Sequence, residues 1–82
     1  MTVRLLLTCM ATEHCSVVLE PYGAEHVLVA GDLLGLEIEG TGEDAVEIAS
    51  SPGCTTVWIP ASAVSVRATD RLGGAVDLGL PL

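Results

Sequence analysis

With 82 residues, half of them apolar, the chain is long enough for one small folded domain, residues 1–82, and too short for two. Eleven acidic residues against three arginines give a formal net charge of −8, which repels phosphates and anionic lipid head groups. This charge argues against nucleic acid and membrane surfaces as partners, and the mean hydropathy of +0.60 argues against disorder.

The first half of the chain alternates apolar and polar residues with the period of two that is typical of half-buried strands. These segments cover residues 3–10, 15–20 and 25–30, with turn residues PYG at 21–23. The run LLTC (6–9) is similar to a lipoprotein cleavage box. The apolar run is shorter than a signal core of about 7 to 15 residues, so we expect a first strand there.

The clearest alternation is LLGLEIE (33–39) in the second half of the chain. Leu34, Leu36 and Ile38 fall on one face of this segment, and its two glutamates fall on the other. A strand with this pattern has one face in the core and one in water. We therefore expect these three aliphatic side chains to be buried.

Four further short segments read as strands, at 45–49, 55–59, 63–69 and 75–78. Ile48 is expected to face the core, and Pro52-Gly53 fits a type II turn, whose third residue needs a positive φ. Turn signals recur about every 8 to 12 residues, as in small barrels and sandwiches. The sequence predicts an all-β fold, a small antiparallel barrel or sandwich of about seven to eight short strands.

Two cysteines and a histidine are close together in CMATEHC (9–15). Cys9, His14 and Cys15 are weak candidates for a zinc site, which would take its fourth ligand from His26 or Cys54. Both cysteines fall on the predicted core faces of their strands, where a free thiol packs like a small hydrophobe. We expect core packing, no metal and no other cofactor. An odd number of cysteines and no convincing leader predict reduced thiols and a cytoplasmic location.

An acidic hairpin is predicted around residues 40–44. If this loop joins two paired strands, Glu37 lies opposite Glu47, and like charges in that position destabilise a sheet. Solvent, Arg4 or Arg67 from a neighbouring strand, a bound cation or a basic partner would offset the repulsion. The two glutamates are therefore candidate contacts for a basic partner.

Tyr22 and Trp58 are the only aromatic residues. Alternation places Trp58 on the face opposite Val57 and Ile59, so its indole is expected to lie outside the core. An exposed tryptophan is a common anchor in interfaces, although it also serves to cover the end of a core. Tyr22, Glu37, Glu47 and Trp58 are our candidate partner-binding residues.

Two resemblances follow from short motifs. LEPYG (19–23), AGD (30–32) and TTVW (55–58), followed by VSVRATD (64–70), resemble a group of small acidic β-rich actinobacterial proteins of unknown function. Gly31-Asp32 and VWIPASAV (57–64) are similar to Src-homology-three-like small barrels. The first resemblance implies a β-rich fold and no activity. The second implies barrel geometry alone, because Ala63 replaces the aromatic of the closing segment.

These features favour a non-catalytic interaction or accessory module over an enzyme. His14 and His26 each follow a glutamate, but adjacent strand residues point to opposite faces and no nucleophile has suitable spacing, so no catalytic residue is expected. Aliphatic residues on the second faces of several strands predict self-association as a homodimer, or docking of another protein, through an apolar and acidic β surface. They are Leu6, Met10, Val18, Val27 and Val29.

Two alternatives remain open. One is a small-molecule-binding β-barrel, possibly enzymatic, with an aliphatic pocket and His26 or Glu37 as the polar contact. The other is a zinc-binding domain that uses Cys9, His14 and Cys15.

Overall fold

The computed structural model is all-β, as predicted, and describes residues 1–43 and 45–82. It contains eight strands and no helix within those ranges, so no described helix could span a membrane. The strands are β1 (Thr2–Thr8), β2 (His14–Glu20), β3 (Ala24–Val29), β4 (Leu33–Gly40), β5 (Glu47–Ser51), β6 (Cys54–Trp58), β7 (Ala63–Thr69) and β8 (Ala75–Val76).

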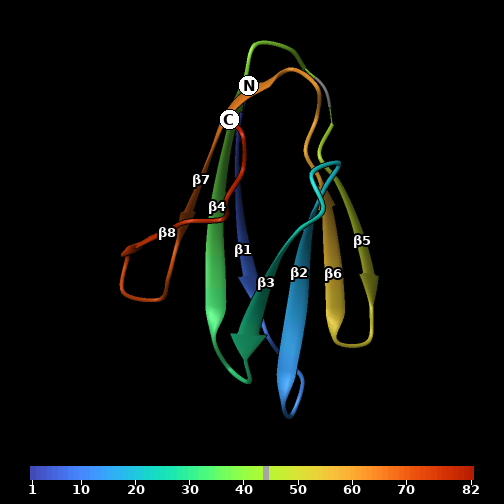
Figure 1. Ribbon diagram of the computed structural model, residues 1–82, viewed down its shortest axis with the longest axis vertical. Coiled ribbons are helices and arrows are strands. Elements are labelled where there is room, and N and C mark those ends of the chain that lie inside the picture. The colour runs from blue at the N-terminus through green and yellow to red at the C-terminus, as the bar shows by residue number, and fades with distance from the viewer. Residues whose placement is uncertain (44) are drawn as a thin grey trace.

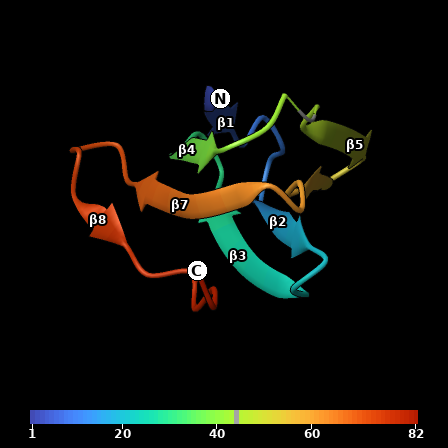
Figure 2. The ribbon, with the colours of Figure 1, turned by 90° about the horizontal axis from the view of Figure 1, so that it is seen from above.

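The strands form two four-stranded sheets rather than a closed barrel. The first sheet has the order β1-β4-β7-β8 and the second has the order β3-β2-β6-β5, which are seen on the left and right of Figure 1. The chain changes sheet after β1, β3, β4 and β6. Both termini lie at the same end of the long axis in Figure 1, and Figure 2 shows that they are separated across it. The fold is a small sandwich.

One strand pair departs from the predicted antiparallel arrangement. β2 and β6 run parallel, with Ser16–Glu20 alongside Cys54–Trp58, whereas the remaining pairs are antiparallel. A parallel pair needs a long connection between its strands. Here the connection includes β3, β4 and β5, so the pairing is non-local and the local pattern does not show it.

The core lies between the sheets and consists of aliphatic residues from alternate positions. Leu34, Leu36 and Ile38 of β4 are buried, as predicted, and they meet Leu19 and Val57 from the second sheet in one cluster. Full burial of a side chain of this size contributes about 1.5 to 3 kcal/mol relative to exposure. The inward positions of these central strands therefore supply most of the stabilisation available to so short a chain.

The predicted acidic hairpin is not formed. β4 and β5 belong to different sheets, because β4 is hydrogen-bonded on both sides, to β1 and to β7, and has no free edge for β5. β5 pairs instead with β6, across a turn in which Gly53 has a φ of +73°, as the Pro52-Gly53 pair predicts. Ile48 shares the inward face with Val57 but lies on an edge strand and is 44% exposed. Asp44, part of the predicted loop, lies outside the described residues.

Candidate functional site

The two cysteines of CMATEHC form a disulfide, which corrects the expectation of reduced thiols. Cys9 is buried in the core as expected, and Cys15 is half-buried. The turn after β1 is tied down by hydrogen bonds from the Cys9 amide to the Asp32 carbonyl (2.8 Å) and from the Gly31 amide to the Cys9 carbonyl (2.9 Å). This turn brings the two Cα atoms within 5.5 Å of each other, a separation that suits a disulfide.

The weak zinc candidates are therefore not gathered as ligands. The sulfurs of Cys9 and Cys15 are bonded to each other, and His14 is exposed at the start of β2. His26 is half-buried on β3 opposite Val17. Within residues 1–43 and 45–82, no group of three or more histidine, cysteine or acidic side chains is placed to hold a metal ion.

Trp58 lies between two carboxylates on the outer face of the second sheet. It is the last residue of β6, the strand between β2 and β5, and its cross-strand partners are Glu20 and Glu47. Residues opposite each other on hydrogen-bonded strands project from the same face about 5 Å apart. Val57 on the inward side is buried, whereas Trp58 is 42% exposed. We call Glu20, Trp58 and Glu47 the Trp58 row.

The Trp58 row is held by backbone hydrogen bonds on both sides of β6. The parallel ladder with β2 is extended by a bond from the Ile59 amide to the Glu20 carbonyl (2.7 Å). The ion pairs found among the described residues involve neither Glu20 nor Glu47. An indole between two carboxylates suits a guanidinium or ammonium group, which is attracted to the ring face and donates hydrogen bonds to both acids.

The sequence predicted two members of this row, Trp58 and Glu47, and missed Glu20. Glu20 could be found only from the register of the parallel β2–β6 pair. Tyr22 is exposed in the turn that follows β2, two residues beyond Glu20 in the sequence. Glu37 lies on the other sheet and is not part of the row.

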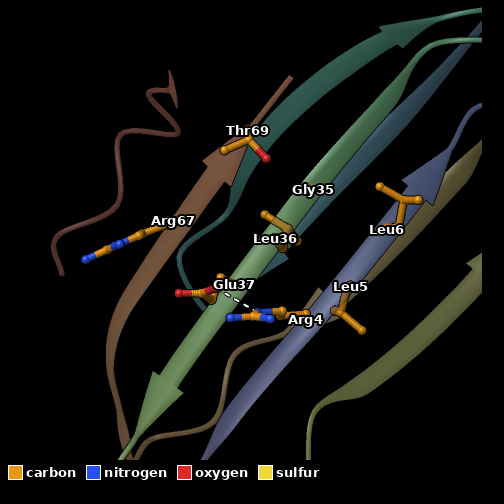
Figure 3. A pocket seen from close by; sticks show the side chains of 8 residues that line it. All are labelled: Arg4, Leu5, Leu6, Gly35, Leu36, Glu37, Arg67 and Thr69. Atoms are coloured by element: carbon orange, nitrogen blue, oxygen red, sulfur yellow. Dashed lines mark hydrogen bonds and ion pairs between the residues drawn. The ribbon is translucent and has the colours of Figure 1, made fainter. Parts of the chain in front are cut away.

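Glu37 lies between two arginines instead of opposite Glu47. Its cross-strand partners are Arg4 on β1 and Arg67 on β7. The Arg4 Nε donates to the Glu37 Oε2 at 3.0 Å, so one of the predicted offsetting arginines is a direct partner. In Figure 3 the Arg67 side chain points away from Glu37. We call Arg4, Glu37 and Arg67 the Arg4 row.

A shallow groove of about 420 Å³ lies beside the Arg4 row on the outer face of the first sheet. Gly35 is in its centre, with Leu6 of β1 and Thr69 of β7 as cross-strand neighbours. Figure 3 shows these two side chains on either side of the glycine. A Cβ atom on Gly35 would lie 2.8 Å from the Thr69 hydroxyl oxygen, so the hollow depends on the missing side chain.

Sequence reasoning missed this groove, although Gly35 occupies an outward position in the clearest alternating segment. Its remaining lining residues are Arg4, Leu5, Leu36, Glu37 and Arg67. The exposed surface of the groove is mainly apolar, and the charged groups of Arg4, Glu37 and Arg67 lie at its border.

Comparison of the chain with protein-family models, curated proteins and solved structures gives no match. The resemblances to actinobacterial β-rich proteins and to Src-homology-three-like barrels stay predictions. Functional inference consequently rests on the chemistry of the two outer faces.

Proposed function

We propose that this domain is a non-catalytic interaction module, and that its Trp58 row binds a cationic segment of a partner protein. The observation that carries the proposal is the position of Trp58 between Glu20 and Glu47 on three hydrogen-bonded strands. An arginine or lysine side chain laid over the indole would contact the negative face of the ring and donate to both carboxylates.

The rigidity of the sheet supports this role. The backbone positions of residues on paired strands are fixed relative to one another, so less conformational entropy is lost on binding than with a mobile loop. The net charge of −8 would also increase the rate at which a basic partner arrives. We include Tyr22 in the surface because it is exposed in the turn directly beyond β2.

Trp58 is the only tryptophan, so its fluorescence reports directly on the row. We expect titration with a hexa-arginine peptide to give a saturable change in Trp58 emission, and a hexa-glutamate peptide to give none. Replacing both carboxylates, Glu20→Gln with Glu47→Gln, is expected to weaken binding of the arginine peptide by about tenfold. This change corresponds to about 1.4 kcal/mol of binding free energy. Isothermal titration calorimetry gives the same dissociation constant independently.

The matched control is the double variant Glu13→Gln with Glu43→Gln. Both residues are exposed and lie outside the row, and the change in net charge is the same. We expect this control to bind the arginine peptide within about twofold of the unmodified protein, because neither side chain belongs to the row and salt screens exposed charges. Equal weakening in both double variants would show that only net charge attracts the peptide, and the proposal would be abandoned.

A further inference from the structure

The flanking residues of the two rows have matching spacing and opposite charge, and Glu37 lies between the two arginines. Glu20 and Glu47 lie on the strands that flank β6, and Arg4 and Arg67 lie on the strands that flank β4. Neighbouring strands are about 4.8 Å apart, so both charged pairs have backbones separated by about 9 to 10 Å. The Cα atoms of the glutamate pair on one copy therefore have about the same spacing as the Cα atoms of the arginine pair on another.

We propose that the partner of the Trp58 row is a second copy of this chain, whose groove at Gly35 receives the Trp58 side chain. This inference rests on the proposed function and names its partner. The cationic segment is then only the local surface of Arg4 and Arg67, and the net charge of −8 on each copy opposes the approach of two copies at long range. Trp58 projects from the middle strand of its row, and Gly35 lies on the middle strand of the facing sheet. The indole would enter between Leu6 and Thr69. Arg4 and Arg67 lie two residues further along their strands, about 7 Å away, so their long side chains would have to extend along the sheet to reach the flanking glutamates.

The size and polarity of the groove fit this occupant. Its volume of about 420 Å³ is in the range of pockets that bind small organic groups, and most of its exposed surface is apolar. The Leu6 side chain, which is 69% exposed in the isolated chain, would be covered by the indole. Tryptophan and arginine are common in interface hot spots, where they fill well-packed pockets that exclude water.

The charges at the border are available for a second molecule. The ion pairs among the described residues do not include Arg67. Arg4 is paired with Glu37, but its side chain is 80% exposed and a guanidinium has five N–H donors. Both arginines can therefore donate to an incoming carboxylate without loss of the Arg4–Glu37 pair.

This contact is heterologous, because the indole and the groove are on different faces of the same chain. Each molecule then offers one surface of each kind, and association continues head to tail beyond a pair. The homodimer predicted from the sequence is thus replaced in this proposal by a head-to-tail oligomer. Sedimentation velocity at physiological salt is expected to show a mass that rises with concentration from the micromolar to the millimolar range.

Two variants separate the two halves of the contact. Trp58→Ala removes the indole and keeps the groove, whereas Gly35→Leu fills the groove and keeps the indole. Gly35 has no positive φ, and a new Cβ there meets only the movable end of the Thr69 side chain below 3.0 Å, so this variant is expected to fold. Far-ultraviolet circular dichroism checks the fold of both.

We expect each variant alone to sediment as a monomer and an equimolar mixture to form a pair of one chain of each kind. The mixture stops at the pair because only one indole and one open groove remain. A mixture that stays monomeric would overturn the inference, as would self-association of Gly35→Leu alone or a wild-type monomer at millimolar concentration. In those cases a fluorescence response of Gly35→Leu to hexa-arginine would show that the proposed function survives and only the partner is wrong.

A charge variant gives a second readout. Arg67→Glu is expected to weaken self-association by at least tenfold. Arg71→Glu changes the net charge equally but lies in the β7–β8 turn outside the groove, and is expected to weaken it by less than threefold. Equal effects of the two substitutions would contradict the contact between Arg67 and the Trp58 row.

Discussion

Replacing Ile38 by alanine is expected to lower the free energy of unfolding by about 2 to 5 kcal/mol. Ile38 is fully buried at 0% exposure on β4, so the truncation removes apolar contacts and leaves a cavity between the sheets. A domain of this length is stable by only about 4 to 12 kcal/mol. The substitution therefore removes a large part of the total, and urea unfolding followed by circular dichroism measures it.

Ile48→Ala is the matched control. Ile48 has the same side chain and also points inward from a strand, but it lies on the edge strand β5 and is 44% exposed. We expect a loss of about 1 kcal/mol, from partial burial and β propensity. An unchanged dependence of stability on urea concentration would show that both variants unfold from the same compact state. Equal losses of unfolding free energy in the two variants would contradict a core centred on β4.

Alternation predicted which side of a strand each residue occupies and could not predict which strands are neighbours. Leu34, Leu36 and Ile38 were placed correctly because their burial depends only on the two faces of one strand. Glu37 was placed opposite Glu47 because a short loop usually joins paired strands. That expectation failed because β1 and β7 occupy both edges of β4, and neither pairing is local in sequence.

The same limit explains what was found and missed at the candidate site. The outward position of Trp58 follows from its buried neighbour Val57, which the alternation shows directly. Its carboxylate neighbours follow from register, and the Glu20 partner comes from a parallel pair far apart in the sequence. Gly35 was visible as an outward glycine in a strong strand. Its place at the centre of the groove could be recognised only once Leu6 and Thr69 were known to lie on the adjacent strands.

The sequence allowed the disulfide but did not determine it. Cys9 and Cys15 were both assigned to core-facing positions at the ends of strands joined by one short turn. A short turn between two inward-facing cysteines makes a disulfide possible, and the structure supplies the Cα separation of 5.5 Å that permits it. The odd number of cysteines and the expected cytoplasmic location favoured free thiols, whereas the structure pairs two and leaves Cys54 free.

The second large effect is expected on reduction of the Cys9–Cys15 bond. In the chain-entropy description, a disulfide that closes a loop as short as 9–15 stabilises the fold by about 2 kcal/mol. For a domain of this size we expect the melting temperature to fall by roughly 8 to 16 °C in a strong thiol reductant. Differential scanning calorimetry measures the fall. The double variant Cys9→Ala with Cys15→Ala should melt at one temperature with or without reductant.

The same bond tests where the chain resides, because structural disulfides persist in oxidising compartments and thiols stay reduced in the cytoplasm. Alkylation in acid-quenched cells, after denaturation and before reduction, is expected to label Cys54 alone if the bond is present in the cell. Labelling of all three cysteines would support the predicted cytoplasmic location. The domain would then exist in the cell without this bond, and its stability there would correspond to the reduced protein.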